Sequence, residues 1–192
     1  ANKQINTACA TFMAFLDYMK QSIRMAAIME LNTKFILTHD SIGVGEDGPT
    51  HQPIEQLAAL RATPNVYTFR PADMVETIES YQVSTELKNA PSVFALSRQN
   101  LPLVRKSYSN ENKTLKGAYS LYQTNKNEQA NAIIIATGSE VQIALDAAKR
   151  LEADKLNIRV VSMPCVELFK EQPDEYKQEI LPNNITARLS IE

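Results

Sequence analysis

One segment, residues 38–51, gathers most of the side chains that could take part in chemistry. It holds both histidines of the chain, three of its five glycines, and three carboxylates (His39, His51, Gly43, Gly45, Gly48, Asp40, Glu46 and Asp47). Histidine changes its charge near neutral pH and can act as a general acid or base. A polar loop after a buried strand is a common place for function in α/β proteins. The segment predicts a binding or catalytic site, and a solvated turn without function is the alternative that spacing leaves open.

The spacing within this segment disfavours three other kinds of site. Cysteine and histidine ligands of zinc usually lie about two to five residues apart, whereas His39 and His51 are twelve apart. Gly45 and Gly48 do not fall where a calcium-binding EF-hand loop needs glycine. A Walker-type phosphate loop needs a lysine, which the segment lacks. The segment therefore favours hydrogen bonding to a polyhydroxylated or carbonyl-bearing ligand, with histidine as a proton shuttle or phosphate partner.

Two further groups of residues could complete such a site. Phe12, Phe15 and Tyr18 recur every three residues, on one side of a helix expected at 11–30. They either pack in the core or form an aromatic wall against a flat heterocycle. Arg98 follows an expected strand, where its guanidinium could hold a phosphate or pair with a surface carboxylate.

The pattern of apolar residues predicts an α/β protein with two parallel-sheet units. Short apolar runs predict strands at 34–38, 66–70, 92–97, 132–136, 158–162 and 186–191. Helical periodicity predicts helices at 11–30, 53–61, 73–88, 140–153 and 172–180. Strands that alternate with helices over short connections indicate parallel sheets. We expect one domain at 1–104, a linker at 105–125 and a second domain at 126–192.

Two of the expected helices carry signals at their first residues. Asp73, followed by Glu76 three residues later, is typical of a capped helix start. Ser139 follows a buried strand and is expected to cap the helix at 140–153 with its side chain. Binding of an anion at this second helix start is the alternative.

Composition and charge restrict the class of protein. Apolar residues make up 44% of the chain and charged residues 22%, which is typical of a globular protein. The net charge of −2, without a basic block, argues against a nucleic-acid partner. No apolar run could span a membrane and no signal peptide is visible, so we expect a cytoplasmic protein with no membrane partner. Cys9 and Cys165 are expected to be reduced thiols.

Both ends of the sequence suggest a piece of a longer chain. The first residue is not Met, and the last expected strand, 186–191, is not followed by a turn or tail. We therefore expect a fragment.

Five segments closely resemble transketolases, which are thiamine-diphosphate enzymes. The first is the histidine segment itself, Thr38 to His51, with the following Gln52-Pro53-Ile54-Glu55. The others are Thr11–Tyr18, similar to a T-F-x-x-F-x-x-Y motif, and the landmarks Arg70–Asp73, Leu96–Pro102 and Ala136–Val141. They occur in the family's order and cover essentially the whole chain. The resemblance implies a pyrimidine-binding domain that lacks its start, followed by the first part of the C-terminal domain.

The resemblance implies a cofactor-binding role for the aromatic residues. Phe12, Phe15 and Tyr18 would line the pocket for the aminopyrimidine ring of thiamine diphosphate. The family transfers a two-carbon glycolaldehyde unit from a ketose phosphate to an aldose phosphate, in the pentose phosphate pathway. The cofactor carries the chemistry that breaks the carbon–carbon bond.

Four other residues match substrate-binding positions of the family. His39 and Arg98 would bind the phosphate of a sugar phosphate, and Asp47 would hydrogen-bond the hydroxyl next to the reacting carbon. His51 would be the catalytic residue, since it would contact the two-carbon unit and help to move protons.

Several parts of the family pattern are absent from the sequence. The family binds diphosphate and a divalent metal, Mg or Ca, through a G-D-G…N motif in an N-terminal domain, and no residue of this chain matches a metal ligand. A glutamate that activates the aminopyrimidine is also missing. We expect the full enzyme to be a homodimer and this chain to be inactive alone. The alternatives are a related thiamine-diphosphate enzyme, such as dihydroxyacetone synthase, or a non-catalytic module for dimerisation or regulation.

Overall fold

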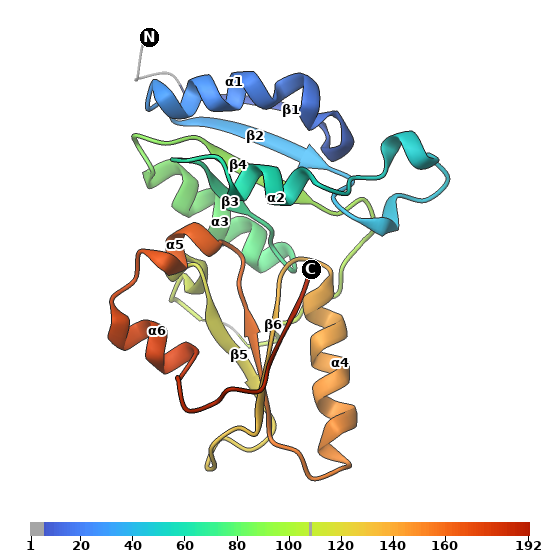
Figure 1. Ribbon diagram of the computed structural model, residues 1–192, viewed down its shortest axis with the longest axis vertical. Helices are drawn as coiled ribbons and strands as arrows, with labels where there is room; N and C mark the ends of the chain where they lie inside the picture. Colours follow the sequence, from blue (N-terminus) through green and yellow to red (C-terminus); the bar gives the residue numbers. More distant parts are fainter. Residues whose placement is uncertain (1–5, 108) are drawn as a thin grey trace.

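The computed structural model describes residues 6–107 and 109–192 as two α/β units, one above the other in Figure 1. Each unit contains a four-stranded sheet, and all strand pairs but one are parallel. The fold class expected from the sequence is therefore confirmed. Within the described ranges, the helices are too short or too polar to cross a membrane.

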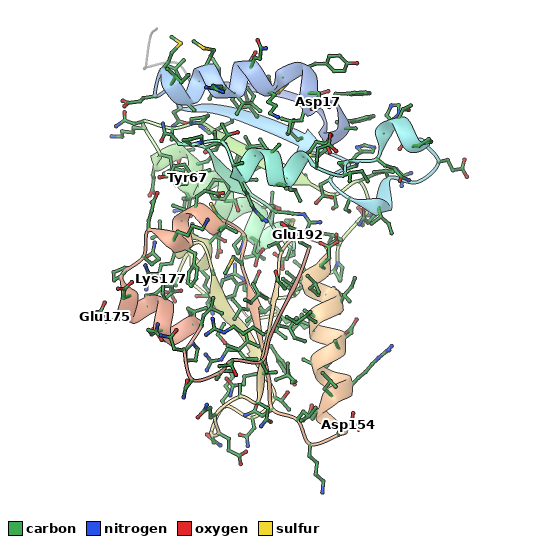
Figure 2. All side chains as sticks on the ribbon, in the orientation of Figure 1. Asp17, Tyr67, Asp154, Glu175, Lys177 and Glu192 are labelled. Atoms are coloured by element: carbon green, nitrogen blue, oxygen red, sulfur yellow. The ribbon has the colours of Figure 1, made fainter. Side chains whose placement is uncertain are left out.

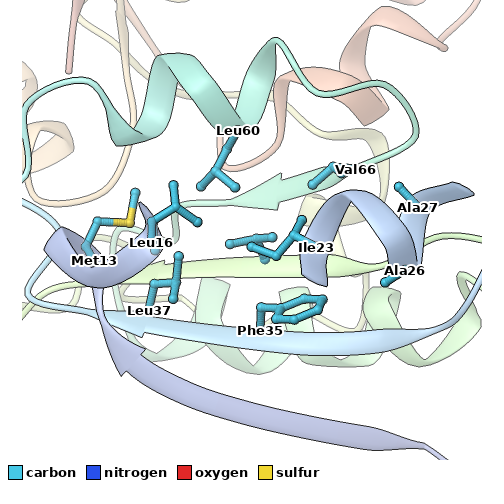
Figure 3. Packing of buried hydrophobic residues seen from close by; sticks show 11 residues of the cluster. Met13, Leu16, Ile23, Ala26, Ala27, Phe35, Leu37, Leu60 and Val66 are labelled. Carbon is cyan, nitrogen blue, oxygen red and sulfur yellow. The ribbon is translucent and has the colours of Figure 1, made fainter. Parts of the chain in front are cut away.

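The first unit is built on a parallel sheet in the order β1-β2-β4-β3. Its strands are β1 (Thr7–Phe12), β2 (Thr33–Thr38), β3 (Tyr67–Phe69) and β4 (Ser92–Leu96). Its helices are α1 (Leu16–Ile28), α2 (Gln56–Arg61) and α3 (Met74–Glu86), with short 3-10 turns η1 (Met13–Phe15), η2 (Ile42–Val44) and η3 (Pro49–His51). Figure 3 shows the core that α1 and α2 make with the sheet, where Leu16, Ile23, Phe35, Leu37 and Leu60 meet.

The second unit has the strand order β5-β7-β6-β8, in which β5 is antiparallel to β7. Its strands are β5 (Tyr119–Gln123), β6 (Ala132–Ala136), β7 (Ile158–Ser162) and β8 (Arg188–Ile191). Its helices are α4 (Glu140–Glu152), α5 (Val166–Lys170) and α6 (Asp174–Ile180), and η4 (Lys113–Lys116) precedes β5. In Figure 1, α4 covers one side of this sheet, while α5 and α6 lie on the other.

The beginning of the chain differs from the expectation of one helix at 11–30. Residues Thr7–Phe12 form β1, which pairs in parallel with β2, and α1 begins only at Leu16. The pairing with β2 explains the difference, because tertiary hydrogen bonds override a helical pattern in the local sequence. Phe12, Phe15 and Tyr18 therefore come from a strand, a 3-10 turn and a helix.

The expected linker at 105–125 is shorter than the sequence suggested. Its last part forms β5, an edge strand of the second sheet, in which Tyr119 and Gln123 are buried. Helix α5 was not expected either, because five residues are too few to show a helical period. Helix α2 begins at Gln56 rather than at Pro53, and the Gln56 side chain accepts a hydrogen bond from Ile54 N–H at 2.7 Å.

Helix α3 lies between the first sheet and the second unit, so it buries polar side chains. Asp73 accepts a hydrogen bond from the Glu76 N–H at 2.8 Å, which confirms the predicted helix start. The fully buried Glu76 carboxylate accepts hydrogen bonds from the hydroxyls of Tyr119 at 2.8 Å and Ser162 at 2.5 Å. Burial raises the pKa of Glu76 above its ordinary value, and these hydrogen bonds only partly oppose that shift.

A buried arginine joins the two units at the start of α4. Arg70 Nε donates to Asp40 at 2.8 Å, and Nη1 donates to the Thr137 carbonyl at 2.9 Å and to the Glu140 carboxylate. Ser139 was expected to cap α4, but its hydroxyl donates to Glu140 instead and makes no capping bond. Because the Arg70 guanidinium occupies this helix start, we assign no anion site there.

Further contacts follow the border between the units. Tyr67 and Glu192, both labelled in Figure 2, lie along it. The Tyr67 hydroxyl donates to Glu171 at 2.6 Å, and Arg61 pairs with Glu192 at 2.5 Å. An apolar cluster that includes Phe69 and Leu168 also spans the border. The two units therefore share one packed interface.

Candidate functional site

Parallel strands bring the predicted site residues to one edge of the first sheet. Phe12 is the last residue of β1, and His39 follows β2 directly. Arg98 comes two residues after the end of β4. The carboxyl ends of parallel strands meet at the same edge, where ligands of open α/β sheets bind.

The two histidines and two of the aromatic residues form one cluster at this edge. The Phe12 ring centroid lies 3.9 Å from that of His39 and 5.9 Å from that of His51. The Phe15 ring is 5.1 Å from that of His51 and 6.1 Å from that of Phe12. The two histidines, which are twelve residues apart, therefore meet at the Phe12 ring, and His51 also lies against Phe15.

Neighbouring hydroxyls orient both imidazoles. His39 Nδ1 lies 3.0 Å from Thr38 Oγ1, and His51 Nδ1 lies 2.9 Å from Thr50 Oγ1. Nε2 of each ring is then the atom left for a ligand or a proton transfer. His39 Nε2 lies 3.9 Å from an Asp47 carboxylate oxygen, which leaves room for a ligand hydroxyl to contact both. His39 also has a positive φ of 61°, a strained conformation for a residue that is not glycine.

Tyr18 lies at the outer end of the aromatic cluster. It is 87% exposed, and its ring centroid is 6.1 Å from that of Phe15. An open pocket of about 460 Å³ adjoins it and is lined by Thr11, Phe15, Tyr18, Met19 and Ser22. A mostly apolar wall with two aromatic rings has the shape and chemistry to take a flat heterocycle.

Arg98 lies against the loop that joins the two histidines. It is exposed, and its guanidinium occupies the space beside Gly45 that a side chain there would need. The next side chain, Gln99, covers Gly43 in the same loop. The backbone N–H of Asp40 also donates to the Leu96 carbonyl at 3.2 Å, so the two loops are joined at their first residues.

No group of three or more metal-binding side chains occurs in residues 6–107 and 109–192. The free cysteines are Cys9, which is exposed, and Cys165, which is buried. Burial raises the pKa of the Cys165 thiol well above its ordinary value, and the Glu167 carboxylate adds to the shift. This thiol is therefore poorly suited to act as a nucleophile.

A buried ion pair that holds the start of the histidine loop was not predicted from the sequence. Asp40, next to His39, forms an ion pair with Arg70 in which both side chains are only 1% exposed. A carboxylate and an arginine, each at the end of an apolar run, were a weak signal for such a buried pair. Their separation of 30 residues prevents any local rule from pairing them.

Two protein-family models together match nearly the whole chain. The transketolase pyrimidine binding domain matches residues 1–104, and the transketolase-like C-terminal domain matches residues 117–192. A transketolase of Rhodobacter capsulatus is 51% identical over 172 residues, 90% of this chain and 25% of that protein. The chloroplastic transketolase of Solanum tuberosum is 47% identical over 184 residues, 96% of this chain and 25% of that protein.

Solved structures of transketolases share the fold. A transketolase from Pichia stipitis in complex with sedoheptulose 7-phosphate has a TM-score of 0.87 and 45% identity, covering 96% of this chain and 26% of that one. Transketolase from Leishmania mexicana has a TM-score of 0.88 and 45% identity, covering 96% of this chain and 27% of that one. A split-gene transketolase described as an inactive beta4 tetramer has a TM-score of 0.65 and 29% identity. The match covers 83% of this chain and 49% of that one.

The fold and the matched domains define a two-unit α/β protein whose first unit is a pyrimidine-binding domain. The chain belongs to the transketolase family. It spans about a quarter of the length of the curated relatives named above.

Proposed function

We propose that this chain supplies the pyrimidine-facing and substrate-facing part of a transketolase. The whole enzyme would transfer a two-carbon glycolaldehyde unit from a ketose phosphate to an aldose phosphate. The observation that carries the proposal is the convergence of Phe12, Phe15, His39 and His51 at the carboxyl edge of the first sheet. The Pichia stipitis relative bound to a sugar phosphate supports the same class of substrate.

The aromatic wall fits thiamine diphosphate. Phe12, Phe15 and Tyr18 would hold its aminopyrimidine ring, and the adjoining pocket has space for a flat ring. When bound, this cofactor supplies the electron sink needed to break a carbon–carbon bond. The described residues contain no group of three or more metal-binding side chains. We therefore propose that the diphosphate and its Mg or Ca ion bind to the family's N-terminal domain.

The polar residues would orient the sugar and move its protons. His51 Nε2 would take or return a proton at the two-carbon unit, since Thr50 holds the other ring nitrogen. His39 and Asp47, 3.9 Å apart, would share a sugar hydroxyl, and His39 would also reach the phosphate. Arg98 would fork onto the phosphate through its N–H groups. These contacts hold the substrate for reaction rather than supply new covalent chemistry.

We further propose that this chain has no transketolase activity by itself and that the whole enzyme is a cytoplasmic homodimer of the pentose phosphate pathway. The split-gene transketolase structure is described as inactive, and it supports the first part of this proposal. The relatives named above are transketolases, so dihydroxyacetone synthase and a non-catalytic module are not favoured.

An assay of glycolaldehyde transfer tests the proposal. The complete polypeptide that carries this sequence is given thiamine diphosphate, Mg²⁺, a ketose phosphate and an aldose phosphate. Transfer is expected, and His51→Ala should lower kcat by about a hundredfold, because general acid–base catalysis contributes about that much. Glu55→Gln, an exposed change four residues after His51, serves as the control and should retain the activity. No transfer by the complete polypeptide, or full activity of His51→Ala, would contradict the proposal.

A further inference from the structure

The guanidinium of Arg98 lies flat against the backbone of Gly45. A Cβ atom added to Gly45 would be 3.1 Å from Cζ, 3.2 Å from Nη1 and 3.3 Å from Nη2 of Arg98. Because these three distances are nearly equal, the face of the guanidinium covers the position that a side chain would take. The N–H groups lie in the guanidinium plane and therefore point along the loop rather than into it.

These N–H groups are available to a ligand. Arg98 is exposed, and no carboxylate among the described residues forms an ion pair with it. Contact with the backbone of Gly45 can therefore fix the guanidinium while its hydrogen-bonding edge stays open. A planar donor held in one pose suits a phosphate better than a freely rotating one does.

We propose that Gly45 is a specificity-determining position that sets the preference for phosphorylated sugars by holding Arg98 in its phosphate-binding pose. Gly45 acts through Arg98 and is therefore a positioning residue. The inference rests on the proposed function, in which Arg98 binds the phosphate of the substrate. A methyl group at this position would displace the guanidinium by a few tenths of an ångström, because the resulting contacts are closer than ordinary van der Waals distances.

A second glycine, two residues before Gly45, makes a similar contact with the residue that follows Arg98. A Cβ atom added to Gly43 would lie 2.5 Å from Oε1 of Gln99, so the Gln99 amide occupies the space that a side chain would need. Two glycines of the histidine loop thus receive two successive side chains of the loop after β4. This double contact fixes the register of the two loops, and it places Arg98 on Gly45 rather than elsewhere.

Gly48 provides a matched control for a substitution at Gly45. Both glycines have positive φ, +81° at Gly45 and +79° at Gly48, in a region that L side chains rarely adopt. An added Cβ at Gly48 meets nothing within 4 Å, whereas at Gly45 it meets Arg98. Alanine at either position therefore strains the backbone in a similar way, but only Gly45→Ala disturbs the guanidinium.

The test compares Michaelis constants in the complete polypeptide loaded with thiamine diphosphate and Mg²⁺. The two acceptors are an aldopentose phosphate and the same aldopentose without phosphate. Gly45→Ala should raise KM for the phosphorylated acceptor about fivefold, a modest effect of misplacing a binding group. KM for the unphosphorylated acceptor should stay within twofold of the Gly48→Ala value. Gly48→Ala should leave the ratio of the two constants as in the parent enzyme.

A double variant shows whether Gly45 acts through Arg98. In an Arg98→Leu background, Gly45→Ala should no longer change the ratio of the two Michaelis constants, since the side chain that it displaces is gone. An unchanged ratio in Gly45→Ala alone, an equal change in Gly48→Ala, or a full effect in the double variant would each overturn the inference. If the parent enzyme transfers no glycolaldehyde unit, the proposed function fails instead, and the two failures are thereby distinguished.

Discussion

Two arginines at the same edge of the first sheet show how differently the junction and the candidate site are built. Arg70 follows β3, is 1% exposed, and bonds to carboxylates from both units, Asp40 and Glu140. Burial alone lowers the pKa of Arg70, but these two carboxylates outweigh that effect and raise it. Arg98 follows β4, is exposed, and lies against a glycine.

The difference indicates which polar groups stabilise the fold and which are free to bind a ligand. Burying a charge costs several kcal/mol unless it is paired, so the polar atoms of the junction are bonded to one another. At the site, neighbouring hydroxyls and ring contacts orient His39 and His51, and one nitrogen of each ring stays available. The polar groups of the junction therefore stabilise the fold, whereas the histidine loop keeps ring nitrogens open, as its proposed binding role requires.

The largest expected effect comes from removing the buried arginine. Arg70→Leu would leave the Asp40 and Glu140 carboxylates without their cation, and one oxygen of Asp40 already lacks a partner. The free energy of unfolding should fall by about 3–5 kcal/mol, as it does when one member of a buried ion pair is removed. Urea unfolding of the chain measures this loss.

Arg98→Leu is the matched control for that measurement. Its guanidinium is exposed and unpaired among the described residues, so the loss of stability should stay within about 0.5 kcal/mol. Equal losses for the two variants would remove the distinction between junction and site.

The next effect concerns the pH dependence of stability at the junction. Because burial raises the pKa of Glu76, the folded chain binds its proton more tightly than the unfolded chain does. The stability from this group is then greatest below about pH 4.3, the ordinary pKa of glutamate, and is lost as the pH rises towards the raised pKa. The Glu76→Gln variant has no carboxyl group at this position and therefore does not lose this stability as the pH rises. The free energy of unfolding of the variant, minus that of the parent, should increase with pH above about 4.3, by up to about 1.4 kcal/mol per pH unit.

Thermal or urea unfolding between pH 4 and pH 8 measures this slope. Three neighbouring groups interact electrostatically with Glu76 and contribute to the same pH dependence: the Asp73 carboxylate, the Arg105 guanidinium and the Tyr119 hydroxyl. Glu175→Gln, an exposed change on α6, is the control and should follow the parent curve. Parallel curves for Glu76→Gln and the parent would show that the buried carboxyl does not carry the effect.

The smallest effect on stability is expected at the outer end of the aromatic wall. Tyr18 is 87% exposed, so Tyr18→Ala should change the free energy of unfolding by less than about 0.5 kcal/mol. In the complete polypeptide it should nevertheless weaken thiamine diphosphate binding about threefold to tenfold, the range expected for one lost aromatic contact. Met29→Ala, an exposed change at the C-cap of the same helix, is the control. Unchanged cofactor affinity for Tyr18→Ala would remove this residue from the wall.

The sequence predicted the buried strands well because their signal is local. Strands β4, β6 and β7 lie within one residue of the expected ranges, since each is a short apolar run between polar residues. Strand β1 was missed because most of its residues are exposed and its partner, β2, is distant in sequence. The antiparallel β5 was missed because its polar residues resemble a linker.

The contacts that bring the candidate site residues together could not be predicted from the sequence. Phe12 and Phe15 were expected on one helix, whereas the end of a strand and a 3-10 turn place them beside the histidines. Periodicity could not reveal this, because the contacts join segments that meet only at the edge of the sheet. The ion pairs of Arg70 with partners 30 and 70 residues away were equally out of reach of local rules.

The most direct test of the central claim measures the Michaelis constant for a phosphorylated acceptor after replacing both His39 and Arg98 in the complete polypeptide. With His39→Ala and Arg98→Leu combined, KM should rise at least about tenfold, because charge-assisted contacts to phosphate contribute about 1.5–3 kcal/mol. The melting temperature should stay within about 2 °C of the parent value, since neither side chain is part of the junction. An unchanged KM, or a collapse of the melting temperature, would contradict the account that the histidine loop binds substrate and the junction carries the fold.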